Sequence, residues 1–375
     1  MIALQRLWFV LAASVSAAFP SLAFAQDCQA LGGRQVSGEQ VRSIAQKLAD
    51  KRLSGLSTYF GGTRTLVLGG DGWRGIGKGE AARDICAWAE VGRFQTLVVT
   101  RNEGPEAKRF SLAETGWFPS GTWTARLAAN ESLDGSLAPL RYAQVWWPLK
   151  PLVLAGEWVV ASLVGLAGLS WGLAIIALAA IVRLLLHPVS RFTARAQAQA
   201  AEQETRLRPV LDEIKRNHKG EDAHNRVLAA HRELGIPSTY RIRPVLGSLV
   251  QIPFLVASFH LLGLMPQLEG QRFLWIDDLA LPDSIAALSV SLPMMGASLN
   301  LLPFAMAASI VGAGYLAVPP AAEAAVKARK RRNTWLTAAV FFVLLYPFPA
   351  ALLLYWTATN LFQLVEARFV GQAAP

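Results

Sequence analysis

The chain has 375 residues, of which 53% are hydrophobic and only 17% are charged, and its mean hydropathy is +0.33. Soluble domains carry roughly 25% charged residues, so this composition excludes a disordered protein and argues against a wholly soluble enzyme. The formal charge is nevertheless +10, with a pI of about 9.9. An apolar chain with a basic excess favours a membrane protein whose positive charge lies on one side, and nucleic-acid binding is the competing explanation.

Residues 1–25 have the pattern of a secretory signal peptide. Arg6 precedes an apolar run over Leu7–Phe19, and Ala23-Phe24-Ala25 follows as a small-residue cleavage site. The run is shorter than the ~20 residues that cross a bilayer. We therefore expect cleavage before Gln26, with an uncleaved anchor as the alternative. In both cases the segment that follows is exported.

Residues 26–145 have the composition of a small soluble domain, with mixed charges and frequent glycine, and this domain is expected to be exported. Val41–Leu53 has the apolar spacing of a helix, and Thr63–Leu68 and Phe94–Thr100 are β-branched runs that indicate strands. The sequence predicts an α+β or mostly β fold. The glycine-rich stretch over 69–79 lacks a Walker Gly-Lys-Ser/Thr, so we interpret it as turns between strands.

Two cysteines, Cys28 and Cys86, lie in this exported segment. An oxidising compartment permits one disulfide between them, and two unpaired thiols are the alternative, because sequence does not give their separation. The chain has no CxxC motif or Cys/His cluster, so we expect no metal. It also has no paired carboxylates and no recognisable Ser/His/Asp spacing, so we expect no cofactor and no chemical catalysis.

From Trp146 the composition becomes that of a membrane protein. Trp146-Trp147-Pro148 is an interfacial aromatic cluster, and the apolar segment over 149–166 carries Lys150 and Glu157, which suits an amphipathic helix in the interface. Five spanning helices are then expected. They are Leu169–Leu186, ending at His187-Pro188, then Pro244–Leu264, Leu299–Val318, and two halves of Trp335–Val365 that are separated by Pro347-Phe348-Pro349. As one helix the last segment would be ~45 Å long, too long for an ordinary span.

The placement of charge orients these helices. The linker over 189–243 holds eleven Lys/Arg and the linker over 319–334 holds five, whereas Met265–Ser298 holds only Arg272 among four acidic residues. The positive-inside rule puts the two basic linkers in the cytoplasm and the third segment outside. The short tail over 371–375 is then cytoplasmic, and the protein is a multi-pass membrane protein.

The first basic linker is itself predicted to be helical. Arg195–His218 and Asp222–Leu234 are rich in helix-forming residues, and Gly220 and Gly235 follow them as stop residues. We expect a charged hairpin of two helices within 189–243, with a solvated spacer as the alternative. Its basic charge suits anionic lipid or ribosomal RNA.

Polar side chains inside the apolar spans are the candidate functional residues. Arg183 is the ionisable one, and it either faces a wet cavity or snorkels to the nearby helix end. Gln251 lies in the middle of the second predicted span, and Thr357, Thr359 and Asn360 interrupt the last one. Such residues commonly join helices, and together with Arg183 they would line a hydrophilic pocket.

Several segments resemble, in order, the YidC membrane-protein insertase family, a bacterial group with mitochondrial and chloroplast relatives. The resemblance covers about residues 146–370 and rests on Trp171-Gly172, Ile181-Val182-Arg183, His187-Pro188, Leu249-Val250-Gln251-Ile252-Pro253-Phe254, Phe273-Leu274-Trp275-Ile276-Asp277-Asp278-Leu279, Tyr346-Pro347-Phe348-Pro349 and Leu354-Tyr355-Trp356-Thr357-Ala358-Thr359-Asn360-Leu361. It implies an all-α membrane protein with a five-transmembrane-helix insertase core and a cytoplasmic helical hairpin. The exported domain matches no module of the family, so its role stays open.

The resemblance also implies a function and a site. The protein would insert and help fold integral membrane proteins, alone or with the Sec translocon, through a hydrophilic groove lined by Arg183, Gln251, Trp356, Thr357, Thr359 and Asn360. Arg183 would attract acidic residues of the substrate, whose apolar helix then leaves along the last helix into lipid. The implied partners are nascent membrane proteins, the ribosome and targeting factors at the hairpin, and membrane lipids, with no DNA. A small-solute transporter and a non-catalytic assembly or scaffold factor are the alternatives.

Overall fold

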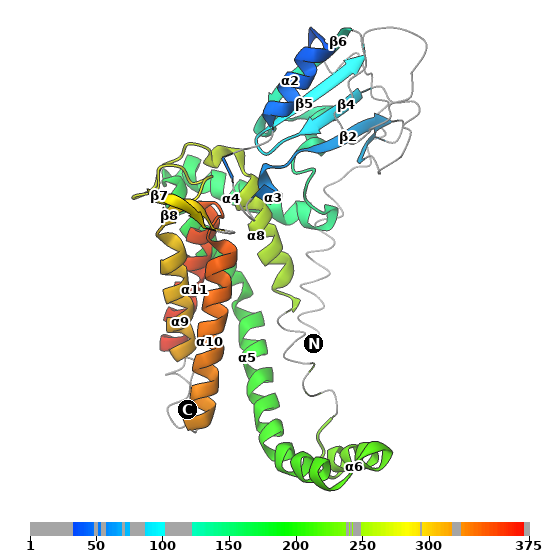
Figure 1. Cartoon of the computed structure of the whole chain (residues 1–375), viewed down its shortest axis with the longest axis vertical. Coiled ribbons are helices and arrows are strands. Elements are labelled where there is room, and N and C mark those ends of the chain that lie inside the picture. Colours follow the sequence, from blue (N-terminus) through cyan, green and yellow to red (C-terminus); the bar gives the residue numbers. More distant parts are fainter. Residues whose placement is uncertain are drawn as a thin grey trace.

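Figure 1 shows the computed structural model as a sheet domain at one end of a helical body, with a helical hairpin at the opposite end. The structure describes residues 33–48, 52–53, 58–69, 72–75, 87–101, 122–237, 240, 242, 249–292, 295–316 and 324–370. The predicted signal peptide over 1–25 and the predicted cysteine pair, Cys28 and Cys86, lie outside these residues.

The sheet domain, which comprises the described residues between 33 and 143, is built on six antiparallel strands in the order β1-β6-β5-β4-β2-β3. These are β1 (Arg34–Ser37), β2 (Arg64–Gly69), β3 (Gly72–Gly75), β4 (Ala87–Val91), β5 (Gln95–Arg101) and β6 (Thr122–Ala129). One face packs on α2 (Gly38–Leu48), and the other packs on Leu133 and on η4 (Gly135–Leu140), which follow the short η3 (Asn130–Ser132). The predicted N-terminal sheet domain is therefore confirmed.

A capping box starts α2 where the sequence predicts a helix. The backbone N–H of Gln40 donates to Ser37 Oγ at 3.3 Å, and the Gln40 side chain accepts from the backbone N–H of Ser37 at 2.9 Å. This reciprocal pair satisfies two of the donors that a helix start leaves free. Buried Val41 and Leu48 then face the sheet.

Glu90, on β4, is a partly buried carboxylate whose charge opposes folding. Thr65 Oγ1 donates to its two oxygens at 2.8 and 3.0 Å, but burial outweighs these bonds and raises the pKa of Glu90. A carboxyl whose pKa is raised by folding contributes stability below its unfolded pKa and loses it as the pH rises through the folded value.

We therefore expect Glu90→Gln to stabilise the protein at neutral pH, because the amide still accepts from Thr65 without a buried charge. The midpoint of thermal unfolding should rise by about 2–4 °C, the equivalent of ~1 kcal/mol. Near pH 3.5 both side chains are largely neutral, so the difference should vanish. Thermal scans at the two pH values check this, and an equal shift at both would contradict it.

The helical body is formed by α4 (Lys150–Ala167), α5 (Trp171–Asn217), α8 (Ile252–Leu264), α9 (Leu302–Leu316), α10 (Ala324–Leu345) and α11 (Ala350–Val370). α11 packs against α5, α8 and α9, and α10 packs against α9. The first turns of α11, from Ala350 to Tyr355, are buried in the largest hydrophobic core. The predicted break at Pro347–Pro349 is confirmed as the turn between α10 and α11.

Two described helices are long and apolar enough to cross a membrane, within Trp147–Ala167 and Trp171–Ile214, and α8 and α9 are shorter apolar helices. Only 22% and 28% of the two apolar windows are buried inside the protein, unlike the core helix of a soluble protein. Leu184 on α5, for example, is 77% exposed. Lipid is the environment that covers such apolar surface without cost. The mostly helical body is thus confirmed, while five spanning helices belong to the proposal below.

α5 corrects the predicted helix end at His187-Pro188. The helix continues through Pro188 and Pro209 to Asn217, because a proline removes one backbone hydrogen bond and leaves the rest of the ladder in place. The predicted first span and the first arm of the hairpin are therefore one helix, and its last part packs beside α6 (Gly220–Glu233) (Figure 1). The hairpin has a small core of Leu207, Ala230, Ile236 and Tyr240.

Two further expectations are corrected between α8 and α9. Gln251 precedes α8 instead of lying mid-helix, since Pro253 occupies the first turn, where its missing N–H costs nothing. An antiparallel hairpin of β7 (Ser284–Leu292) and β8 (Gly296–Asn300) interrupts the predicted all-α membrane region. Its uncharged sequence is rich in alternating apolar residues and serine, which favours strands.

Candidate functional site

Arg183 lies on the apolar part of α5 and is paired with Glu366 of α11. Its Nε and Nη2 lie 2.9 and 2.7 Å from Glu366 Oε2, and His187 Nδ1 lies 2.5 Å from Oε1. Both carboxylate oxygens are therefore engaged. The side chains of Arg183 and Glu366 are 19% and 20% exposed, so the pair is largely withdrawn from solvent without being sealed.

The sequence prediction missed Glu366 and the role of His187. Glu366 is the only acidic residue after Glu323, and it follows the predicted end of the last span by one position. Arg183 lies near the end of the predicted span Leu169–Leu186, and Glu366 lies in the last turns of α11. Because the predicted topology runs the first and last spans in the same direction, comparing the charges near their far ends would have suggested this pair.

The polar residues of α11 face different neighbours. Thr359 lies two turns before Glu366 and therefore on the same helix face, and its Oγ1 donates to the Tyr355 carbonyl at 2.8 Å. Asn360 Nδ2 donates to Ser309 Oγ of α9 at 3.2 Å. The Trp356 ring packs edge-on against Phe341 of α10, with ring centroids 6.1 Å apart.

Two buried polar atoms of α11 have no hydrogen-bond partner among the described residues, namely Trp356 Nε1 and Thr357 Oγ1. An unpaired polar group costs about 1–3 kcal/mol in apolar surroundings, so water or a ligand normally satisfies it. Gln251 lies outside this group: it precedes α8, and its backbone carbonyl accepts from Leu255 N at 3.0 Å. The six predicted site residues thus lie on α5, on α11 and at the start of α8.

A second group of buried polar residues joins the sheet domain to the helical body. Arg93, only 2% exposed, donates from Nε to the Gly263 carbonyl at 2.8 Å and from Nη2 to the Ala280 carbonyl at 2.6 Å. Its guanidinium also lies 4.5 Å from the centroid of the Phe94 ring. These contacts tie the turn between β4 and β5 to the end of α8.

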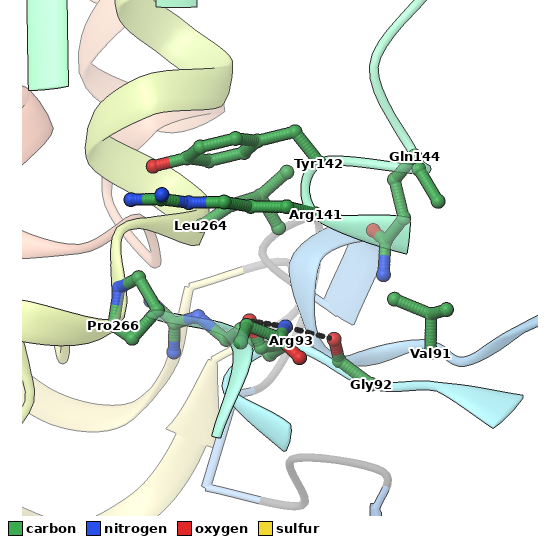
Figure 2. Close-up of a pocket in the computed structure, with 10 residues that line it drawn as sticks. Val91, Gly92, Arg93, Arg141, Tyr142, Gln144, Leu264 and Pro266 are labelled. Carbon is green, nitrogen blue, oxygen red and sulfur yellow. Dashed lines mark hydrogen bonds between the residues drawn. The ribbon is translucent and has the colours of Figure 1, made fainter. Parts of the chain in front are cut away.

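Arg141 forms the other half of this junction. It pairs with buried Glu157 of α4, which also accepts from Gln267 Nε2 at 2.8 Å. Figure 2 shows Arg93 and Arg141 projecting into one small pocket, with the Tyr142 ring lying alongside Arg141. The middle of α4 is thereby held at the sheet-domain end of α8.

Aromatic packing completes the junction. Phe60, on α3 (Thr58–Gly61), is fully buried against Phe259 and Phe348, with ring centroids 4.7 and 5.9 Å away. Gly263 gives the Phe60 ring its space, since a Cβ there would lie 2.2 Å from ring atoms. One hydrophobic core therefore continues from the sheet domain into α4, α5, α8 and α11.

Several relatives that share one name match half or more of the chain. "Membrane protein insertase YidC" of Chlamydia caviae is 27% identical over 212 residues, which is 54% of this chain and 25% of that protein. The protein of the same name from Treponema denticola is 26% identical and matches 54% of this chain and 34% of its own length. The one from Syntrophobacter fumaroxidans is 26% identical over 294 residues, 76% of this chain and 48% of that protein. The chain thus spans a quarter to about half of these relatives.

A solved structure described as an active YidC insertase, with its first transmembrane domain resolved, aligns at 17% identity and a TM-score of 0.38. The alignment covers 74% of this chain and 62% of that chain. The family model described as "60Kd inner membrane protein" matches residues 162–374, which is more than half of the chain and includes Arg183, Glu366 and all of α11. The chain therefore belongs to the 60Kd inner membrane protein family.

Proposed function

We propose that this protein is a membrane protein insertase, which inserts integral membrane proteins and helps them fold through a hydrophilic groove between its helices. Membership of the 60Kd inner membrane protein family supports the proposal, as do relatives named membrane protein insertase. The observation that carries it is Arg183, the only Lys, Arg, Asp or Glu in the apolar stretch Trp171–Leu186 of α5.

The proposed mechanism is electrostatic and involves no covalent step. A cation withdrawn from water attracts carboxylates strongly, because the low dielectric weakens screening. Arg183 draws acidic residues of an entering segment partway across the bilayer. There Trp356 Nε1 and Thr357 Oγ1, which have no hydrogen-bond partner in the described part of the chain, favour bound water. Thr359 lies on the same face of α11 as Glu366, and Gln251 and Asn360 are proposed to line the path from the start of α8 and from the side of α11 that faces α9. The apolar helix of the substrate then leaves along α11 into lipid, driven by burial of its apolar surface.

We propose the same topology as the charge pattern predicts, in the bacterial inner membrane. The sheet domain and the acidic segment after α8 lie at one end of the helical body, and the basic hairpin lies at the other (Figure 1). This separation supports a periplasmic domain over 26–145 and a core over 146–370 with five spans, its hairpin over 189–243 and the C-terminus being cytoplasmic. A cleaved signal peptide over 1–25 is part of the proposal.

The proposed partners are inferred mainly from the basic charge of the hairpin. The hairpin carries exposed arginines such as Arg206 and Arg226, each engaged by an acidic residue one turn away. Its remaining basic charge suits the ribosome, targeting factors and anionic lipid. Nascent membrane proteins are the substrates, and the Sec translocon is a proposed companion.

Depletion of the protein from its own cells tests the proposed function. We expect small membrane proteins to accumulate uninserted, as protease sensitivity of their exported segments would show, and a plasmid copy to restore them. A scaffold factor instead predicts normal insertion followed by failed assembly of complexes. A solute transporter predicts normal insertion and assembly, and either of these outcomes would contradict the proposal.

A further inference from the structure

We infer that Glu366 is a resident counter-ion of Arg183, which an entering acidic segment must displace, and that it thereby sets how acidic a substrate must be. The inference rests on the proposed function and deepens it. It assigns a specificity-determining role to a residue on the helix along which the substrate is proposed to leave.

The geometry is that of an occupied anion site. Glu366 Oε2 accepts a hydrogen bond from Arg183 Nε at 2.9 Å and lies 2.7 Å from Arg183 Nη2 in an ion pair, and its Oε1 lies 2.5 Å from His187 Nδ1. A planar guanidinium offering two N–H groups to one carboxylate is the arrangement that also recognises carboxylates of other molecules. A second carboxylate therefore meets Arg183 with its preferred face already taken.

The depth of Arg183 and Glu366 along their helices suits the replacement of Glu366 by a substrate carboxylate. Arg183 lies ~18 Å along α5 from Trp171, and Glu366 lies ~24 Å along α11 from Ala350. In a hydrocarbon core ~30 Å thick, both are in the half away from the sheet domain, which is the half that a segment from the cytoplasm enters first. About a fifth of each side chain is exposed, so the ion pair is not sealed inside the protein.

The Arg183–Glu366 ion pair sets an energetic threshold that a substrate must exceed to bind Arg183. Glu366 is held on a packed neighbouring helix, so it competes for Arg183 at a high effective concentration. A single substrate carboxylate must lose conformational freedom to bind Arg183, and this entropy cost weakens its competition. Displacement therefore requires several acidic residues or additional contacts. Replacing the carboxylate with a neutral amide removes the charged competitor and leaves the guanidinium available.

The test compares variants of the full chain, purified and reconstituted in lipid vesicles, on a matched set of nascent substrates. The exported segment of each substrate carries zero, one, two or three aspartates, and protease protection measures its insertion. In Glu366→Gln vesicles, the substrate with one aspartate should insert about fivefold better than with the unmodified protein, the equivalent of ~1 kcal/mol for a partly exposed ion pair, while insertion of the substrate without aspartate should be unchanged. Asp277→Asn, which removes an exposed carboxylate that pairs with Arg272 in the segment after α8, is the matched control and should change nothing.

The other possible outcomes of this experiment each test a different claim. If Glu366→Gln lowers insertion of all four substrates alike, Glu366 only holds α5 and α11 together and the inference is wrong. Should that variant fail to fold, Glu366→Asp, which keeps the charge but shortens the reach to Arg183, must still raise insertion of the one-aspartate substrate. If the unmodified protein inserts none of the substrates, the proposed function fails instead. If it inserts them regardless of aspartate number, the attraction to Arg183 fails.

Discussion

Insertion of membrane proteins with acidic exported segments is expected to fall by about tenfold or more when Arg183 is replaced by glutamate, because ~1.4 kcal/mol or more of attraction is lost and repulsion takes its place. Arg183→Glu also puts a second carboxylate beside Glu366. Breaking a fully buried pair costs about 3–5 kcal/mol of folding free energy. The cost here should be nearer ~2 kcal/mol, since the pair is partly exposed. Complementation of a depleted strain and thermal unfolding of the purified variant measure the two effects.

A double variant separates function from stability. Arg183→Met combined with Glu366→Gln removes both charges, and replacing a whole ion pair is often neutral for folding. We expect its unfolding midpoint to lie near that of the unmodified protein while insertion of acidic substrates stays low. Full insertion activity in the double variant would show that the guanidinium is dispensable and would refute the groove mechanism.

Phe60→Ala is expected to detach the sheet domain from the helices, with a loss of about 3–5 kcal/mol, as for other buried aromatic truncations. The ring is fully buried between Phe259 and Phe348, and Gly263 makes room for it. The two hydrophobic clusters on the faces of the sheet do not include Phe60, so the sheet itself should stay folded. Thermal unfolding should change from one transition to two, and limited proteolysis should cut near the junction.

The control for this variant is Leu127→Ala, which truncates a half-exposed side chain on β6 of the same domain. A surface truncation of this kind changes the free energy of unfolding by less than about 0.5 kcal/mol. One unaltered transition in Phe60→Ala would mean that Arg93 and Glu157 hold the junction without the aromatic contacts.

Local sequence patterns correctly predicted the helices and strands whose boundaries are set by residues nearby in the sequence. The proline pair at Pro347 and Pro349 separates α10 from α11 as expected, and β2 and β5 follow the β-branched runs. Pro188 was misread because a proline weighs against helix locally, whereas a long helix tolerates one missing bond. Gln251 was misplaced for a related reason, since Pro253 sits comfortably in a first helical turn.

Contacts between distant parts of the chain escaped prediction. Arg183 stands out in sequence because it is alone in an apolar stretch, but its partner Glu366 is 183 positions away. Arg93 looks like an ordinary arginine of an exported domain, and only folding places it against the carbonyls of Gly263 and Ala280. Periodicity identifies which face of a helix is apolar, and it carries no information about which helix that face meets.

Photo-crosslinking of a nascent chain to α11 tests most directly the claim that substrates pass beside Arg183. A photoreactive residue is placed at position 356 or 359, and at Leu336 of α10, which is 59% exposed and apolar, as the lipid-facing control. With a stalled membrane-protein substrate, we predict adducts at 356 and 359 that weaken in Arg183→Ala, and few or none at 336. Absence of adducts at both α11 positions, with a crosslink to the nascent chain at another site as a working control, would contradict the assigned path.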